Sequence, residues 1–248
     1  MAKLSGKVAV VSGASKGIGA AIAEKLAENG AAVVVNYSAS ADQAQAVVER
    51  IRSRGGKARA VQADVSKPAE AKKLIETARR DFGSVDILVN NAGVYEFRPI
   101  HEVDEAHFDR IFDLNVKGLL FATQAAVGAF DGKGGRVINI SSLASQVAMP
   151  QTSVYSATKA AVDSITRTLA AELGPRKILV NSILPGPVET EGTRALADFE
   201  SVRATFLPRT PLGRIGQPED IANVAVFLAS EEAGWITGQV IPVAGGLN

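Results

Sequence analysis

Cysteine is absent from the 248 residues of this chain, and histidine is scarce, with only His101 and His107. Without cysteine the protein forms no disulfide and offers no thiolate as a nucleophile or metal ligand. Both histidines lie in a polar stretch, where we expect surface positions, and the sequence contains no HExxH or Cys/His cluster. The sequence therefore predicts neither thiol chemistry nor a metal site.

An excess of charge of one sign is also missing, since 27 basic residues face 26 acidic ones without a dense basic run. This balance argues against nucleic acid or an anionic membrane as the main partner. No apolar run approaches the roughly 20 residues that a membrane-spanning helix needs, and the start, MAKLSGK, has no apolar signal segment. We expect a soluble, cytoplasmic protein that acts on a small molecule.

Short apolar segments alternate with longer segments of helical composition. The expected strands are residues 7–12, 32–36, 57–63, 85–90, 136–140, 178–184 and 239–243, and the expected helices are 20–29, 41–54, 66–82, 104–130, 154–173 and 218–229. This alternation is typical of βαβ units, and strands that are apolar throughout have both faces covered. The sequence predicts an α/β fold, a Rossmann-like, doubly wound parallel sheet of seven strands with helices on both faces.

The chain shows no linker or shift in composition, so we expect residues 1–248 to form a single domain. Residues 1–100 would mainly bind a cofactor, and residues 101–248 would hold the catalytic groups and the substrate. A polar, mixed segment at about 190–212 is expected to form a lid over the site.

A glycine-rich turn, GASKGIG, joins the first expected strand to the first expected helix. In a phosphate cradle Gly13 would permit the turn, Gly17 would let the backbone approach a pyrophosphate, and Gly19 would let helix and strand pack closely. The spacing differs from GxGxxG, and a plain tight turn is the alternative. Its place between strand and helix favours a nucleotide site, with contacts from Gly13, Ser15, Lys16, Gly17, Ile18 and Gly19.

The second expected strand ends in Asn36-Tyr37-Ser38, where NAD-binding Rossmann domains usually place a carboxylate for the ribose 2′-hydroxyl. A carboxylate would repel a 2′-phosphate, and here it is missing, while Lys16 adds a cation nearby. The sequence therefore favours NADP(H) as the cofactor, with NAD(H) as the alternative. On this interpretation, Asn36→Asp would shift the preference toward NADH.

Two further polar groups follow in the chain. Small residues in Asn90-Asn91-Ala92-Gly93, after the fourth strand, would let the backbone approach a ligand, although a simple turn is the alternative. Asn115 lies inside an apolar helical segment, where a buried amide needs partners. It could hold a water or the helix backbone, or be a satisfied core amide.

Tyr155 and Lys159 are four residues apart, so on a helix they share one face. An ammonium beside a phenol favours the phenolate and lowers the pKa of the tyrosine from about 10. Such a tyrosine could transfer a proton near neutral pH. The pair alone would more often be a solvated helix face.

These motifs occur in the order of a known family. GASKGIG, Asn90–Gly93, Asn115, Ser142, Tyr155-x-x-x-Lys159 and Pro185–Thr190 resemble those of the classical short-chain dehydrogenase/reductase family, and the resemblance covers essentially the whole chain. It implies the sheet order 3-2-1-4-5-6-7 and commonly a homotetramer. Two departures are Ser12, where many members have threonine, and Ala244, where aspartate or asparagine is commoner.

The resemblance also implies roles for the matching residues. Tyr155 would be the general acid in reduction and the base in oxidation, Lys159 would lower its pKa and hold the nicotinamide ribose, and Ser142 would orient the substrate carbonyl. Asn115 would hold a water that links Lys159 to solvent. The cofactor contacts would include Asp64 and Val65 at the adenine side and Pro185, Gly186, Val188 and Thr190 at the nicotinamide.

Substrate residues are suggested by position. Tyr95, Phe97, Leu143, Val147, Met149, Pro187, Phe199 and Phe206 would line an apolar pocket for an uncharged ketone or aldehyde, although several could simply pack the lid. The resemblance extends to 3-oxoacyl-acyl-carrier-protein reductases, but the helix before Asp131 ends in AAVGAF, and Ala171 stands where an arginine that docks the acyl carrier protein is typical. We therefore favour a general carbonyl reductase over an acyl-carrier-protein reductase. A non-catalytic NADP(H) sensor is the alternative of another class.

Overall fold

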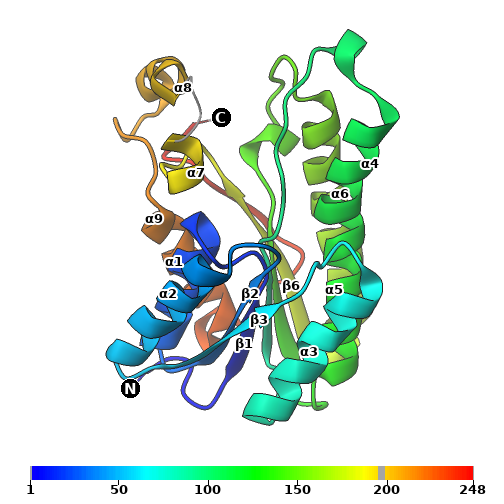
Figure 1. The fold of residues 1–248 in the computed structure, drawn as a ribbon, viewed down its shortest axis with the longest axis vertical. Helices are drawn as coiled ribbons and strands as arrows, with labels where there is room; N and C mark the ends of the chain where they lie inside the picture. Colours follow the sequence, from blue (N-terminus) through cyan, green and yellow to red (C-terminus); the bar gives the residue numbers. More distant parts are fainter. Residues whose placement is uncertain (1, 195–198, 248) are drawn as a thin grey trace.

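One parallel sheet of seven strands organises the protein in the computed structural model, which describes residues 2–194 and 199–247 (Figure 1). The side chains of Phe199 and Val202 are also outside that description. The strands are β1 (Val8–Val11), β2 (Ala32–Tyr37), β3 (Lys57–Gln62), β4 (Ile87–Asn90), β5 (Gly135–Ile140), β6 (Ile178–Pro185) and β7 (Val240–Val243). Their order, β3-β2-β1-β4-β5-β6-β7, and their parallel pairing confirm the predicted fold.

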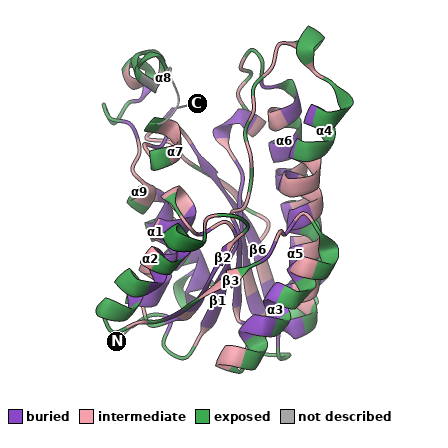
Figure 2. Cartoon of the chain, viewed as in Figure 1, coloured by how far each residue is buried: buried purple, intermediate pink, exposed green. Residues whose placement is uncertain are grey.

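Helices cover both faces of this sheet. The helices α1 (Gly17–Glu28), α2 (Ala41–Ser53) and α9 (Pro218–Ala229) lie on one face, and α3 (Pro68–Phe82), α5 (Leu119–Ala129) and α6 (Ser153–Leu173) on the other (Figure 1). Because strand side chains alternate between faces, Ala9 and Val11 join the first core while Val10 joins the second. The central strands are accordingly buried in the middle of the molecule, whereas the edge strands β3 and β7 are partly exposed (Figure 2).

The helix expected at 104–130 is not continuous. It consists of α4 (Glu105–Phe112), a π-helical turn at Asp113–Gly118, and α5. Single π turns often occur at functional sites, and this one carries Asn115. The expected surface position of His107 is wrong, because its ring is 3% exposed and Nε2 lies 3.1 Å from the Glu96 carbonyl oxygen.

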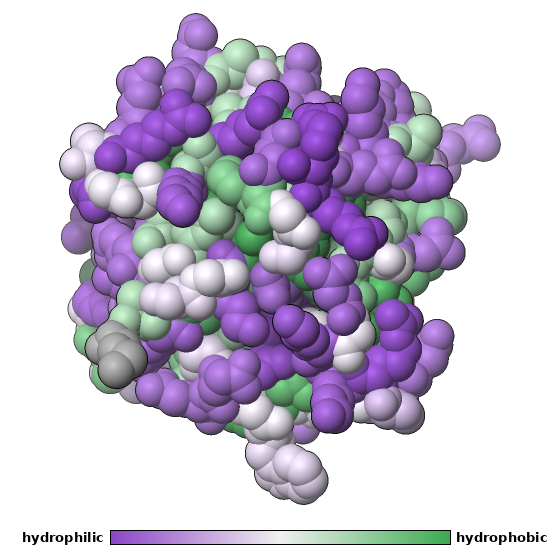
Figure 3. Space-filling view, turned by 90° about the horizontal axis from the view of Figure 1, so that it is seen from below, coloured by the Kyte–Doolittle hydropathy of each residue, from purple (hydrophilic) through white to green (hydrophobic). Residues whose placement is uncertain are grey.

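Shorter elements complete the fold. They are the 3-10 turns at Ile100–Glu102, Leu143–Ser145, Gly174–Arg176, Leu207–Arg209 and Glu231–Ala233, and the helices α7 (Glu191–Arg194) and α8 (Phe199–Phe206). Both helices lie near the carboxyl edge of the sheet, at the upper left of Figure 1. The surface of the molecule seen from below is covered mostly by hydrophilic side chains (Figure 3). In the described part of the chain, no helix has the length and apolar character to cross a membrane.

Candidate active site

The carboxyl edge of the sheet brings together the motifs found in the sequence. The chain leaves β1, β4, β5 and β6 there, at the end where α7 and α8 lie (Figure 1). Open parallel sheets bind their ligands at this edge, so the fold places every candidate segment where a ligand is expected.

The turn after β1 is shaped so that only glycine fits at its key positions. Gly13 and Gly17 have φ angles of +61° and +57°, in the left-handed region that disfavours side chains. A Cβ on Gly13 would lie 2.8 Å from the Cα of Ala92, and one on Gly19 would meet the Asn91 amide and the Gly13 carbonyl. The turn thus packs directly against the segment after β4.

The start of α1 has the properties of an anion site. Lys16, at its N-cap, supplies no side-chain cap, and the first turn contains no acidic residue. Backbone N–H groups and the helix dipole favour a negative charge there. Lys16 is exposed and Ser15 partly buried, whereas Ile18 packs on the core of its face of the sheet. These residues therefore fit the phosphates of a nucleotide cofactor.

Ser12 joins this turn to the Asn90–Gly93 segment. Its hydroxyl accepts from the backbone N–H groups of Asn91 and Ala92, at 3.0 Å each, and donates to the Val89 carbonyl at 3.3 Å. The Asn91 amide donates in return to the carbonyls of Ser12 and Gly13, at 3.0 and 2.9 Å. The Asn91 side chain is thus occupied within the protein, and Ser12 has a structural role that the sequence did not reveal.

Asn36 does not face a cofactor. It is 2% exposed, and its Oδ1 accepts from the Gly13 N–H at 3.1 Å. Its Nδ2 donates to the carbonyls of Tyr37, Val61 and Ala63 at 3.3, 3.3 and 3.0 Å. All polar atoms of this side chain hold the glycine turn against β2 and β3, so a cofactor contact of Asn36 stays a prediction for its backbone. Ser38 is exposed and Tyr37 partly buried beyond it.

Asn90 is also turned inward. It is 4% exposed, and its amide donates to Thr123 and to Asn139, at 2.9 Å each. This places its side chain in the layer between the sheet and α5, and the approach of the Asn90 backbone to a cofactor stays a prediction. At the end of β3, Val65 is buried, and Asp64 accepts from the Ser66 hydroxyl, which holds the pKa of Asp64 below its usual value.

Asn115 is a satisfied core amide in this structure. Its Oδ1 accepts from the Val94 N–H at 2.9 Å, and its Nδ2 donates to the Val94 carbonyl at 3.0 Å and to the Thr158 hydroxyl at 3.1 Å. It thereby ties the segment after β4 to α6. A Cβ on Gly93 would lie 3.1 Å from Asn115 Oδ1 and 3.7 Å from Lys159 Nζ, so glycine keeps this corner open.

Ser142, Tyr155 and Lys159 converge beside that corner. Ser142 follows β5 and caps the turn at Leu143–Ser145, while Tyr155 and Lys159 lie in the first turns of α6. Lys159 Nζ lies 5.7 Å from the centroid of the Tyr155 ring and donates to the Ile140 carbonyl at 2.9 Å. The predicted shared face of α6 is therefore present, next to the carboxyl end of β5.

The expected lowering of the Tyr155 pKa is not found. Burial raises its pKa above the usual value, and hydrogen bonding by Ser142 opposes that rise only in part. Lys159 is directed at the Ile140 carbonyl, and burial lowers the pKa of its ammonium to about 8. Tyr155 is therefore protonated at neutral pH, the form that can donate a proton to a substrate oxygen.

The predicted substrate residues are not gathered in one pocket. Tyr95 and Phe97 do approach the site, since the Phe97 ring lies edge-on to Tyr155 with 5.7 Å between centroids, and Tyr95 lies 6.1 Å from Phe97. Leu143 is 7% exposed and belongs to the interior. Phe206 is partly buried beside Arg209, and the Phe199 side chain lies outside the described residues.

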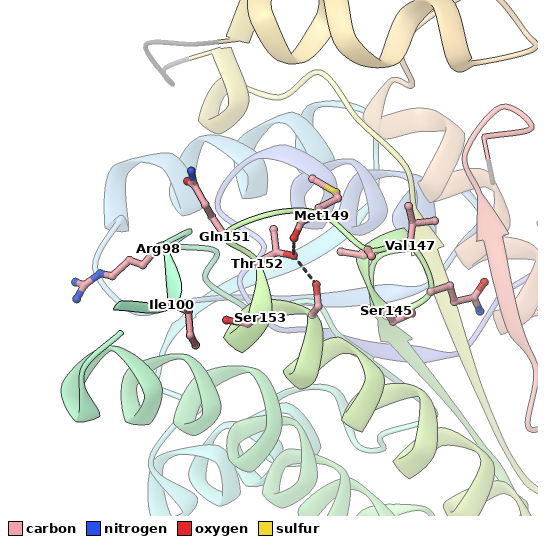
Figure 4. A pocket seen from close by; sticks show the side chains of 12 residues that line it. Arg98, Ile100, Ser145, Val147, Met149, Gln151, Thr152 and Ser153 are labelled. Carbon is pink, nitrogen blue, oxygen red and sulfur yellow. Dashed lines mark hydrogen bonds between the residues drawn. The ribbon is translucent and has the colours of Figure 1, made fainter. Parts of the chain in front are cut away.

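Val147 and Met149 line a different cavity, of about 530 Å³, together with Arg98, Ile100, Thr152 and Ser156 (Figure 4). Its lining includes neither Ser142 nor Tyr155. Pro187 lines another hollow, together with Leu212, Arg214 and Ala244. Position in the sequence could not separate these surfaces, because the loop at 143–152 presents side chains on two sides.

The segment after β6 lies over the glycine turn. A Cβ on Gly17 would lie 3.4 Å from the Thr190 methyl group, and Val188 is buried. A Cβ on Gly186 would lie 2.8 Å from the Cβ of Ala244, so the unusual alanine packs directly against Pro185-Gly186. The segment is therefore placed to hold the part of a ligand that extends beyond the phosphates.

Comparison with known proteins agrees with this geometry. Residues 13–248 match the family model described as enoyl-(acyl carrier protein) reductase. An uncharacterized oxidoreductase of Methylorubrum extorquens is 58% identical over the full length of both chains. A probable tetrahydroxynaphthalene reductase of Zymoseptoria tritici is 41% identical over 98% of this chain and 95% of its own length.

Solved structures extend the comparison. A short-chain dehydrogenase/reductase from Serratia marcescens is 40% identical with a TM-score of 0.93, covering 99% of each chain. The 7α-hydroxysteroid dehydrogenase complexed with NADH and 7-oxo glycochenodeoxycholic acid is 37% identical, with a TM-score of 0.95 over 99% and 97% of the chains. The angucycline C-6 ketoreductase LanV with bound NADP is 41% identical, with a TM-score of 0.93 over 99% and 96%.

The fold and these matches define a class of oxidoreductases that use a nicotinamide cofactor. Within that class, the chain belongs to the short-chain dehydrogenase/reductase family.

Proposed function

We propose that this protein is an NADPH-dependent reductase that converts an uncharged ketone or aldehyde to an alcohol, reversibly, with Tyr155 as the acid and base. The convergence of Ser142, Tyr155 and Lys159 beside the glycine turn carries this proposal. When bound, the cofactor supplies the hydride. The protein supplies the binding site, the orientation and the proton.

The roles of the residues follow from their places. The Ser142 hydroxyl and the Tyr155 phenol would hold the substrate oxygen, and Tyr155 would give it a proton during reduction and remove one during oxidation. Lys159 would hold the nicotinamide ribose, and Asn115 would fix the α6 side of the site through Val94 and Thr158. The backbone of Gly13–Gly19 would hold the phosphates, with Asp64 and Val65 near the adenine and Pro185–Thr190 near the nicotinamide.

NADPH is proposed over NADH because the exposed end of β2 has no carboxylate at Tyr37 or Ser38, while Lys16 is exposed beside the glycine turn. The named structures do not decide this point, since LanV holds NADP and the hydroxysteroid dehydrogenase holds NADH. The preference therefore rests on charge alone.

The aromatic row Tyr95, Phe97 and Tyr155 favours a flat or cyclic apolar ketone. The names of the relatives agree, since they describe a probable tetrahydroxynaphthalene reductase, an angucycline ketoreductase and a hydroxysteroid dehydrogenase complexed with a 7-oxo compound. An acyl-carrier-protein thioester is the second candidate, favoured by the description of the matching family model.

A substrate panel tests the proposal. Oxidation of NADPH and NADH would be followed with cyclic aromatic ketones, small ketones, an aldehyde and a 3-oxoacyl-carrier thioester. We expect turnover of the cyclic ketones with NADPH. Turnover of the thioester alone would instead support an acyl-carrier-protein reductase. Tight NADPH binding without any turnover would favour a sensor.

The carboxylate of Glu191 gives a prediction about cofactor affinity. Its Oε2 accepts from the Gly17 N–H at 3.1 Å, where the cofactor phosphates are proposed to bind. Because the two anions would compete for one donor, Glu191→Gln should tighten NADPH binding on the order of fivefold in a fluorescence titration. Glu189→Gln is the control, since Glu189 contacts Arg194 and Gln217 instead. Equal affinity of the Glu191 variant and the wild type would contradict the prediction.

We also propose a homotetramer. Most of the apolar face of α9 is buried within its own chain. Phe227 on that helix, Leu120 on α5 and the fully exposed Trp235 remain as apolar surface. Light scattering at micromolar concentration should give four times the chain mass of 25.8 kDa, and a monomer mass would contradict the proposal.

A further inference from the structure

A buried carboxylate lies next to the candidate active site without a part in the proposed chemistry. Asp163 is on α6, one helical turn after Lys159, and is 4% exposed. Its Oδ2 accepts from the Ser145 hydroxyl at 2.6 Å, and its Oδ1 accepts from the Ser182 hydroxyl at 3.2 Å. These bonds join α6 to the turn at Leu143–Ser145 and to β6. Two neutral hydroxyls do not balance a buried negative charge, which needs a cation nearby.

Lys159 is a buried cation one helical turn before Asp163 on α6. Residues four apart on a helix lie on one side, and Lys159 is 6% exposed. Its ammonium donates to the neutral Ile140 carbonyl at 2.9 Å, so its own charge also needs compensation. Burial lowers the pKa of Lys159 to about 8, and the charge of Asp163 acts in the opposite direction, raising it. The charge of Asp163 thus favours the protonated form of Lys159.

The other cations on α6 or packed against it are exposed or engaged elsewhere, and Arg167 on α6 itself is exposed. The turn at Leu143–Ser145 and strand β6 carry no charged side chain. The titratable residues on the remaining elements packed against α6 are Glu105, His107, Asp109, Arg110, Asp113, Lys117 and Arg176. Arg110 pairs with Glu96, Lys117 with Asp113, and Arg176 donates to the Val127 carbonyl. Within the described chain, Asp163 supplies the one charge that shifts the pKa of Lys159.

We propose that Asp163 is a positioning residue, which keeps Lys159 protonated at neutral pH and, through Ser145, fixes the loop that carries Ser142 against α6. The proposal deepens the proposed reductase function and rests on it for its kinetic consequence. Ser142 precedes the turn at Leu143–Ser145, and Asp163 is hydrogen-bonded to that turn through Ser145. Lys159 lies on α6, one helical turn before Asp163. A single carboxylate therefore sets both the charge and the spacing of the site.

The kinetic test is the pH profile of Asp163→Asn. With a pKa of about 8, Lys159 is largely protonated at pH 7, and loss of the neighbouring charge lowers that pKa toward neutrality. The alkaline limb of kcat/KM for reduction should therefore move to lower pH by about one unit. Ser145→Ala is the matched control, because it removes the hydrogen bond and keeps the charge, so its limb should stay in place. Coinciding limbs for Asp163→Asn and the wild type would overturn the proposal.

A second test does not depend on turnover. In thermal unfolding at pH 7, Asp163→Asn should lower the Tm of the wild type, because it isolates a buried ammonium, but raise the Tm of Lys159→Met, because there it removes an isolated carboxylate. The difference between these two changes in Tm measures the coupling between Asp163 and Lys159. Because folded Lys159 loses its proton above about pH 8, the coupling should shrink at pH 9.5.

The two tests distinguish a failure of this proposal from a failure of the proposed reductase function. If no ketone is reduced, the proposed function fails while the unfolding cycle still decides whether Asp163 and Lys159 are coupled. A Tm change of the same sign and size in both backgrounds would overturn the proposal. A failure of Asp163→Asn to fold in both backgrounds would do the same, whereas folding only with Lys159→Met would support it.

Discussion

Replacement of Tyr155 by phenylalanine should reduce kcat for carbonyl reduction by about 10³-fold, because it removes the proposed proton donor. NADPH affinity, read by fluorescence, should stay within about threefold, since the glycine turn and the Pro185–Thr190 segment are unchanged. The ring that packs edge-on against Phe97 is retained, so the Tm should change little.

Tyr95→Phe is the matched control. It removes the hydroxyl of the other tyrosine in the same aromatic row. Tyr95 is 44% exposed, and its hydroxyl has no part in the proposed proton transfer. We expect this variant to keep most of its turnover. If Tyr155→Phe kept comparable turnover, another group would have to supply the proton, and the proposed mechanism would be wrong.

Asn36→Asp is expected to damage the protein rather than change its cofactor preference. A carboxylate there would replace a donor by an acceptor beside the carbonyls of Tyr37, Val61 and Ala63 in a site that is 2% exposed. A buried, unsatisfied charge of this kind costs about 3 kcal/mol, equivalent to a fall in Tm of roughly 10 °C for a chain of this size. Affinity for both NADPH and NADH should fall together, because Asn36 also holds the Gly13 N–H.

Ser38→Asp provides the comparison. Ser38 is exposed just after β2, so a carboxylate there remains solvated and should leave the Tm close to that of the wild type. Its charge would repel the 2′-phosphate of NADPH, and we expect the ratio of NADPH to NADH affinity to fall about tenfold. A shift in this ratio for Asn36→Asp with an unchanged Tm would restore the interpretation made from the sequence.

Periodicity and composition were sufficient for the strands, a parallel sheet and most helices, because buried β-branched runs and glycine-terminated helices are local signals. The order of the strands followed from the family resemblance alone. The motif residues were also found, but not the direction of their side chains. Asn36 and Asn90 end strands at the ligand edge, yet their amides turn inward to meet carbonyl and hydroxyl partners that are 25 to 49 residues away. Such partners are set by tertiary packing and leave no mark in local sequence.

Asp163, in contrast, could have been recognised from the sequence. Asp163 follows Lys159 at the same spacing that joined Tyr155 to Lys159, and a carboxylate on the core face of an apolar helix needs an explanation. The raised pKa of Tyr155 was beyond the sequence, because it depends on burial in the tertiary structure and, to a smaller extent, on the charge interaction with Tyr95. The substrate residues were the least predictable, since one loop lines two surfaces.

The π turn at Asp113–Gly118 lets the helical segment from α4 to α5 serve two requirements. Each residue of an α-helix advances the side chains by about 100°, so the accommodation of an extra residue changes the rotational phase of α5 relative to α4. Asn115 can then face Val94 while Ala122 and Ala126 still face the sheet. Deletion of one residue in this turn would bring the two segments back into a common phase, so either the amide or the alanine face would be misdirected.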